Sequence, residues 1–289
     1  MRLVCLITQG FTGAVFVAAL FFGQIGWPVQ KTETYKDIIQ KAQTLFAQKD
    51  RPQAISLLSS AIKKEGKNQA AVVEMTSALE EIGFAFLSEK AQQLYELGLS
   101  WKRTDPKAAL GKISEALAIE PEQFQLTAES IWLNIALNDC AKAYQLSIKA
   151  RSDVASISSL DLAAAQAALC LGKFLEYKQI IPKKIEKSDQ AFWNTSQIEY
   201  LFKASELDKA MSLIELMIKS EAQFPEVHYW KWKIATAQNQ SEAASATKYV
   251  SLCKGLTPRA ARLYNSEPNL CRRTAEVESF LKKQNNQNE

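Results

Sequence analysis

Apolar side chains recur every three or four residues along most of the chain, which is the spacing of one face of an amphipathic helix. The clearest example is the stretch 94–121, where the spacing is interrupted only at Thr104, Asp105 and Pro106. Proline suits the first turn of a helix, because the N–H group that it lacks would have no partner there. This stretch therefore predicts two short helices joined by a tight turn.

Similar pairs of amphipathic segments, separated by short polar turns, occur throughout the chain. They span 35–61, 124–150, 160–185, 191–221 and 227–254. Successive turns are roughly 30 to 34 residues apart, and a fixed period in this range is typical of repeat proteins in which helical hairpins stack on one another. The chain of 289 residues has only ten glycines and eight prolines, which also favours helices over a β-sandwich.

The register of the pattern is ambiguous over residues 69–121. A longer apolar helix is predicted over 69–87, and the helix that follows it is also the first helix of the 94–121 hairpin. Either three helices form one unit here or the repeat is non-standard. The candidates for the inward face of the 69–87 helix are Ala70, Val73, Met75, Leu79, Ile82 and Phe86.

The hairpin at 94–121 resembles a tetratricopeptide repeat. Its first helix matches that repeat at Leu94, Leu97, Gly98 and Trp101, and its second helix keeps the family's offsets of four, three and five residues at Ala109, Ile113, Ala116 and Pro121. The turn is one residue shorter than usual, so this hairpin is a variant. The resemblance implies an all-α fold over residues 35–257, an α-solenoid of stacked helix-turn-helix repeats. Small residues are expected where the two helices of a hairpin approach each other, at Ala54, Ala109, Ala143 and Ala210.

The N-terminal residues 1–29 are predicted to direct export. No charged residue occurs between Leu3 and Trp27, and about 20 apolar residues are enough to cross a bilayer as a helix. A possible cleavage site at Val17, Ala18 and Ala19 also fits a signal peptide. The segment is thus a signal-anchor or a cleaved signal peptide, with a buried core helix as a third possibility. Residues 30–34 are expected to be a linker, and the body to lie in the periplasm, anchored in the inner membrane or released.

The repeat pattern fades after residue 257. Two more helices are predicted within 258–283, where a more polar terminal helix would cap the array, because its outer face has no neighbour to cover it. Residues 284–289 are polar and are predicted to be a disordered tail.

Four cysteines are candidates for disulfides in the exported body. Cys140 lies at the turn of one hairpin and Cys170 just before the next turn, and adjacent repeats place their turns at the same edge of the array. Cys253 ends a hairpin and Cys271 begins the cap. We therefore expect the pairs Cys140–Cys170 and Cys253–Cys271 in an oxidising compartment. Four buried free thiols are the alternative, since cysteine is among the most buried residue types.

The sequence offers no catalytic, metal or cofactor site. His228 is the only histidine, so zinc sites built on a histidine pair are excluded. Phosphate-binding glycine motifs are absent. The net charge of +4 is small for this length and shows no basic clustering on one face, which argues against a nucleic-acid partner. We therefore expect no enzymatic activity and no cofactor.

The family resemblance places a protein partner on the face made by the first helices of the hairpins. The register carried over from the family gives Trp132, Leu162, Gln166, Phe192, Glu199, Phe202, Lys203, His228 and Trp232 as candidate contacts. Tryptophan and other aromatic side chains contribute much of the energy at protein interfaces. Each of these residues is also a candidate for the core, because aromatic stripes on helices usually pack inward. For His228 in particular, a core position among packed aromatic side chains is the alternative.

These observations favour a non-enzymatic scaffold in the bacterial envelope, similar to repeat proteins that support pilus, secretion or outer-membrane assembly. The partner would be an envelope protein, and the N-terminal segment would provide the membrane contact. The alternative is a cell-wall-associated enzyme or ligand-binding protein built on an α-solenoid. That alternative needs a catalytic domain with a glutamate, for which the sequence after Leu256 leaves little room.

Overall fold

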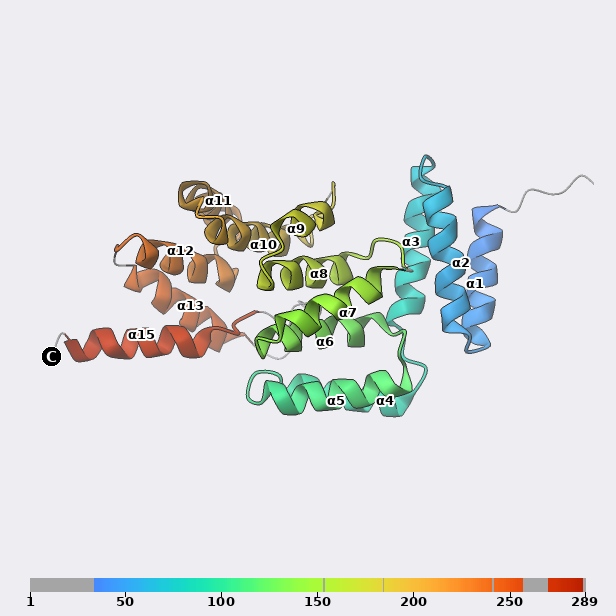
Figure 1. Cartoon of the computed structure of the whole chain (residues 1–289), viewed down its shortest axis with the longest axis horizontal. Coiled ribbons are helices and arrows are strands. Elements are labelled where there is room, and N and C mark those ends of the chain that lie inside the picture. Colours follow the sequence, from blue (N-terminus) through green and yellow to red (C-terminus); the bar gives the residue numbers. More distant parts are fainter. Residues whose placement is uncertain (1–33, 153, 184, 241, 257–269, 288–289) are drawn as a thin grey trace, which may run out of the picture. The chain divides into compact units, whose positions relative to one another are not determined.

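A computed structural model describes residues 34–152, 154–183, 185–240, 242–256 and 270–287. These residues form fourteen α-helices and, within those ranges, no strand. In chain order the helices are α1 Tyr35–Ala47, α2 Arg51–Lys64, α3 Gln69–Phe84, α4 Glu89–Trp101, α5 Pro106–Ile119, α6 Phe124–Ala136, α7 Cys140–Ser152, α8 Ser158–Cys170, α9 Phe174–Ile180, α10 Gln190–Lys203, α11 Leu207–Ser220, α12 Pro225–Ala237, α13 Ala243–Gly255 and α15 Thr274–Gln287 (Figure 1). The all-α prediction is confirmed.

Five of the helical hairpins share one type of turn. Two residues after the end of each first helix lies a residue of positive φ, and the N–H of the residue that follows it donates to the carbonyl oxygen five residues earlier, at 2.8 or 2.9 Å. This is the bond pattern of the Schellman motif, which satisfies carbonyl groups at a helix C-terminus. The residues of positive φ are Lys49, Asn138, Gly172, Ser205 and Asn239. The turns therefore repeat in backbone geometry although their sequences differ.

The α4–α5 hairpin, the one that prompted the resemblance, has a different turn. Its backbone contains no residue of positive φ, and the N–H of Asp105 donates to the carbonyl of Trp101, four residues before it, at 2.7 Å. Asp105 then caps α5 by accepting a bond from the N–H of Ala108 at 2.9 Å, with Pro106 as the first helical residue. The shorter turn predicted from the sequence thus corresponds to a tighter backbone connection.

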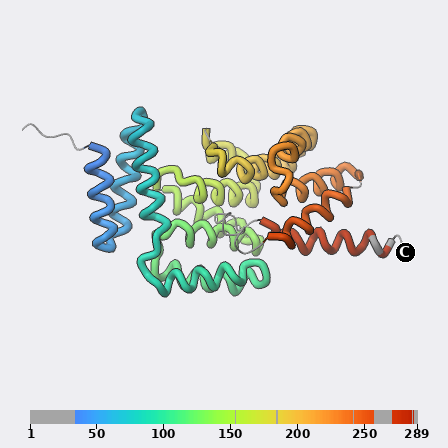
Figure 2. Tube along the Cα trace, turned by 180° about the vertical axis from the view of Figure 1, so that it is seen from behind, coloured from blue at the N-terminus to red at the C-terminus, as the bar shows by residue number. Residues whose placement is uncertain are grey.

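The ambiguity over residues 69–121 is resolved in favour of a non-standard repeat, because α3 does not form one unit with α4 and α5. Helix α3 packs against α1 and α2, and α4 pairs with α5 (Figures 1 and 2). Met75, Leu79 and Ile82 are buried as predicted, whereas Ala70 and Val73 are exposed, Val73 to 62%. Those two lie in the first turns of α3, on a face that neither α1 nor α2 covers. The helix also ends at Phe84, earlier than predicted, because Ala85 adopts an extended conformation.

Small residues lie where helices approach most closely. All four predicted alanines, Ala54, Ala109, Ala143 and Ala210, are completely buried. A Cβ atom on Gly98 of α4 would lie 2.9 Å from Cδ1 of Ile113 in α5. A Cβ atom on Gly83 of α3 would lie 2.1 Å from the ring of Phe124 in α6. Glycine at these two positions therefore permits the α4–α5 contact and a direct α3–α6 contact.

The buried side chains form two clusters. The larger one extends from α1 to α15, and the smaller one joins α4, α5 and one face of α6. The smaller cluster contains Ala91, Tyr95, Ala109, Ile113, Ala116, Leu126 and Leu133. Helix α6 contributes to both clusters, which explains why it is buried almost all round.

The C-terminal helix α15 packs against α13. It extends to Gln287, so residues 284–287 are helical where a disordered tail was predicted. The other predicted capping helix, near 259–264, and the N-terminal segment 1–29 lie outside the described residues. Among the helices that the structure describes, none combines the length and the apolar character needed to cross a membrane.

Candidate functional site

The predicted partner-binding residues lie on the first helices of four successive hairpins, α6, α8, α10 and α12. Five of the nine meet around one small cleft: Trp132, Leu162, Gln166, Phe192 and Glu199. The register carried over from the sequence therefore brings these positions together. Each of the five is nevertheless less than 10% exposed.

Their burial has an identifiable cause, because the segment that precedes α15 covers this face. Arg273 of that segment forms ion pairs with Glu199 of α10 at 3.4 Å and with Glu226 of α12 at 3.5 Å. Its guanidinium group also lies over the rings of Tyr229 and Trp230, at 4.5 and 4.9 Å from their centroids. A guanidinium over an aromatic face is attracted by the negative potential of the ring. One side chain thus joins the cap to two hairpins.

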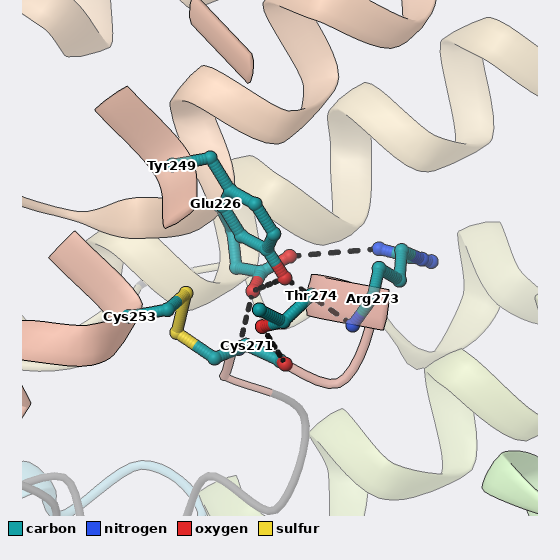
Figure 3. The surroundings of a disulfide bond; sticks show 6 residues. All are labelled: Glu226, Tyr249, Cys253, Cys271, Arg273 and Thr274. Carbon is teal, nitrogen blue, oxygen red and sulfur yellow. Dashed lines mark hydrogen bonds and ion pairs between the residues drawn. A yellow bond between two sulfur atoms is a disulfide. The ribbon is translucent and has the colours of Figure 1, made fainter. Parts of the chain in front are cut away.

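Glu226 is the centre of the buried network shown in Figure 3. Its carboxylate accepts a hydrogen bond from the backbone N–H of Cys271 at 2.7 Å and one from the hydroxyl of Tyr249 at 3.5 Å. The hydroxyl of Tyr249 in turn accepts a bond from the N–H of Arg273 at 3.2 Å. The disulfide Cys253–Cys271 holds the same segment to α13, with a Cα–Cα distance of 5.5 Å.

The two glutamates of this network have opposite pKa shifts. Burial raises the pKa of Glu226, and this effect exceeds the opposing attraction of Arg273. Burial also raises the pKa of Glu199, but the positive charges of Arg273, Arg272 and Lys203 outweigh it and lower the pKa overall. Glu199 therefore remains ionised more readily than an ordinary glutamate, whereas Glu226 takes up a proton more easily.

The other predicted contacts make intramolecular interactions of their own. Trp232 packs against Phe280 of α15, with 5.1 Å between ring centroids. Nε2 of His228 lies 2.9 Å from the carbonyl oxygen of Ala222, at a position that is 9% exposed. The ammonium group of Lys203 donates to the carbonyl oxygen of Leu169 at 2.8 Å and so caps the end of α8.

Phe202 is half-buried and packs against Trp230, with 5.5 Å between ring centroids. Like the others, it holds helices of the array together. A partner-binding role for the nine residues stays a prediction.

Both predicted cysteine pairs are at bonding distance. Besides Cys253–Cys271, the disulfide Cys140–Cys170 joins the start of α7 to the end of α8, with a Cα–Cα distance of 5.4 Å. The prediction that turns of adjacent hairpins lie at the same edge of the array is thereby supported.

Sequence analysis missed a basic cleft next to this network. A cleft of about 620 Å³ lies between the α4–α5 turn, α6, α13 and α15. Its lining includes the cationic residues Lys102, Arg103, Lys254, Arg272 and Arg273. In the sequence this cleft is visible only as two pairs of adjacent basic residues, at 102–103 and 272–273. The two pairs are 169 positions apart, and only the fold brings them together.

A buried ion pair was also missed. Nη1 of Arg51, at the start of α2, lies 2.8 Å from Oε2 of Glu120, at the end of α5, and both side chains are almost fully buried. The carboxylate of Glu120 also accepts bonds from the N–H groups of Leu87 and Ser88, at 3.0 and 2.6 Å. This pair connects the α1–α3 unit to the α4–α5 hairpin.

The described residues contain no group of His, Cys, Asp and Glu side chains that is arranged to hold a metal ion. One further buried carboxylate has a raised pKa, that of Glu129 in α6, where burial outweighs the nearby Lys102 at 3.6 Å.

Comparison with solved structures shows a likeness in fold, whereas the other two comparisons found nothing. No protein-family model matches the chain, and no curated protein matches it. A solved structure described as a tetratricopeptide repeat protein from Parabacteroides merdae ATCC 43184 is similar, with 18% identity and a TM-score of 0.44, over 80% of this chain and 98% of that one. The helices and hairpin turns described above themselves define this chain as an all-α array of stacked helical hairpins.

Proposed function

We propose that the protein is an exported, non-enzymatic scaffold that binds other proteins in the bacterial envelope. Residues 1–29 are its export signal or inner-membrane anchor, and the helical array works in the periplasm. The partner is an envelope protein that belongs to a larger assembly, of the kind that builds pili, secretion systems or the outer membrane.

The observation that supports export most directly is the pair of disulfides. Cys140–Cys170 joins two adjacent hairpins, and Cys253–Cys271 joins the last hairpin to the segment before α15. Disulfides form and persist in oxidising compartments such as the bacterial periplasm and are rare in the cytosol. Two independent pairs at bonding distance therefore favour an exported body.

The scaffold role is supported by the repetition of the hairpins. Five turns with the same backbone geometry place successive helix pairs in a regular order. Arrays of this kind form extended surfaces on which a segment of another protein can lie. In this chain part of that surface is covered by the protein's own C-terminal segment, so the partner would contact what that segment leaves free.

Fractionation and crosslinking of bacteria that express the tagged full chain test both parts of the proposal. We expect the body to be cleaved by protease added from the periplasmic side and to migrate faster on a gel without reductant than with it. A photo-crosslinker at Thr195, which lines the small cleft, should join the protein to an envelope component. A body that is protected until the cytoplasm is opened would refute export. Failure to crosslink at Thr195 and at further exposed positions along the array would refute the scaffold role.

A further inference from the structure

The basic cleft has more positive charge than its own acidic residues neutralise. Glu278 is the one acidic residue among its described lining residues, and it pairs with Lys254 at 2.9 Å. Lys102 is paired with Glu129 of α6, and Arg273 with the two glutamates described above. The remaining two cations, Arg103 and Arg272, have no ion pair within the described part of the chain.

Arg272 is the more unusual of the two. It is half-buried and lies directly beside the charged Arg273. Burial and repulsion from Arg273 lower the pKa of Arg272, more than the attraction of Glu199 and Glu226 raises it. A guanidinium group that is partly removed from water beside a second one is stabilised when an anion provides charge-assisted hydrogen bonds.

A buried donor without a partner lies on the same wall. Trp132 lines both this cleft and the small one, as Arg272 does. Its side chain is 2% exposed, and its indole N–H has no acceptor among the residues that the structure describes. Most buried N–H groups in proteins have an acceptor. The indole N–H groups of Trp193, Trp230 and Trp232 also lack one among the described residues, but of the four only Trp132 lines this cleft, where its N–H is available to a ligand.

We propose that this cleft binds an acidic, carboxylate-rich segment of a partner protein through Arg272, Arg103 and the indole N–H of Trp132. The inference rests on the proposed scaffold function and names the chemistry that its partner presents. Arginine matches the planar carboxylate with two parallel hydrogen bonds, which a lysine does not offer. The volume of about 620 Å³ exceeds the space needed by a single small anion and fits several residues of an extended chain. Apolar lining residues such as Leu133 and Pro106 provide contacts for its aliphatic atoms.

The test uses the full oxidised chain and a fluorescein-labelled peptide of about eight residues, in which glutamate alternates with alanine. We expect saturable binding in fluorescence anisotropy, weakening with salt, and no saturable binding of the matched peptide with glutamine in place of glutamate. Substitution Arg272→Gln should weaken binding about tenfold or more, because it removes a charged hydrogen-bond donor. Trp132→Phe should weaken it less and keep the packing of the ring.

Two controls keep the test decisive. Arg103→Gln changes an exposed turn residue and should also weaken peptide binding, and at an exposed position this loss does not result from unfolding. Lys219→Gln removes an exposed charge on α11, outside the cleft, and this variant should bind the peptide as the unaltered chain does. Equal affinity for both peptides, or unchanged binding by both arginine variants, would overturn the inference. Stronger binding of single-stranded RNA than of the acidic peptide would overturn it as well.

The outcome can be separated from that of the proposed function. If an envelope protein still crosslinks to the array while the acidic peptide does not bind, the scaffold stands and the acidic-segment inference falls. If the peptide binds but no envelope protein is ever crosslinked, the scaffold proposal fails although the cleft is a carboxylate site.

Discussion

Replacement of Arg51 by methionine should destabilise the protein strongly, because Arg51 is the buried partner of Glu120. The two side chains are only 3% and 5% exposed, and their charged atoms are 2.8 Å apart. The arginine also donates to the carbonyl oxygen of Ala85, in the connection between α3 and α4. The substitution Arg51→Met keeps most of the side-chain length but leaves the carboxylate of Glu120 without its cation.

The magnitude follows from what remains around that carboxylate. Loss of one partner of a buried ion pair costs about 3–5 kcal/mol of folding free energy, because the other charge stays out of water. Glu120 keeps its hydrogen bonds from the N–H groups of Leu87 and Ser88, so we expect the lower end, about 3 kcal/mol. Glu120→Gln should cost a similar amount, since it leaves the guanidinium unpaired. The double variant removes both charges, and its cost should fall below the sum of the single ones by about 2 kcal/mol.

Urea unfolding followed by circular dichroism measures these free energies. The exposed pair Lys112–Glu115, at 2.7 Å, provides the matched control, and Lys112→Met should cost no more than about 0.5 kcal/mol. Hydrogen exchange of the amides at Leu87 and Ser88 should also accelerate in Arg51→Met. If Arg51→Met costs no more than Lys112→Met, or if the two single effects add without coupling, the buried pair does not connect the helices as described.

Three further outcomes follow from the structure. Cys253→Ser removes the disulfide between Cys253 and Cys271, which are 18 positions apart in sequence. The loss should lower the free energy of unfolding by roughly 3 kcal/mol, and a chain that is equally stable with and without reductant would contradict this. The pKa of Glu199 is lowered in the folded state, so its contribution is present above its ordinary value of 4.5 and is lost as the pH falls through the folded pKa. Accordingly Glu199→Gln should be less stable than the parent chain at pH 7, with a difference that shrinks in titrations below pH 4.5; a constant difference would speak against the ion pairs of this residue. Gly83→Ala places a Cβ atom 2.1 Å from a phenyl ring of α6 and should lower the free energy of unfolding by about 1–3 kcal/mol. Gly111→Ala meets no atom within 4 Å and should stabilise α5 by up to about 1 kcal/mol. If thermal unfolding shows Gly83→Ala to be the more stable of the two variants, the close α3–α6 contact is refuted.

The sequence was sufficient to predict the hairpins because their signal is local. Helical spacing of apolar residues and polar turns determine where each helix begins and ends, and these are properties of neighbouring residues. The alanines at helix contacts were found in the same way. Ala70 and Val73 were misplaced, because periodicity identifies an apolar face but does not show how far a neighbouring helix extends along it.

The candidate site depended on contacts that local patterns do not contain. The repeat register placed Glu199 and Trp232 on first helices of hairpins, but it did not show that Arg273 and Phe280 would pack against them. These pairs are 74 and 48 positions apart in sequence, and nothing in the helical spacing relates them. The Arg51–Glu120 pair and the basic cleft were missed for the same reason, since each joins residues from separate hairpins.

The chain enters and leaves the α4–α5 hairpin at nearly one point. The N–H of Ser88, just before α4, lies 2.6 Å from the carboxylate of Glu120, just after α5. Meanwhile α3 and α6 touch directly, through Gly83 and Phe124. The hairpin is therefore topologically a side branch, and the stack is continuous without it. Along the sequence the hairpin is one more repeat, but in space it is an insertion. A linker that replaced it would have to keep Glu120 as the partner of Arg51 and would expose the apolar side chains that the hairpin covers on α6.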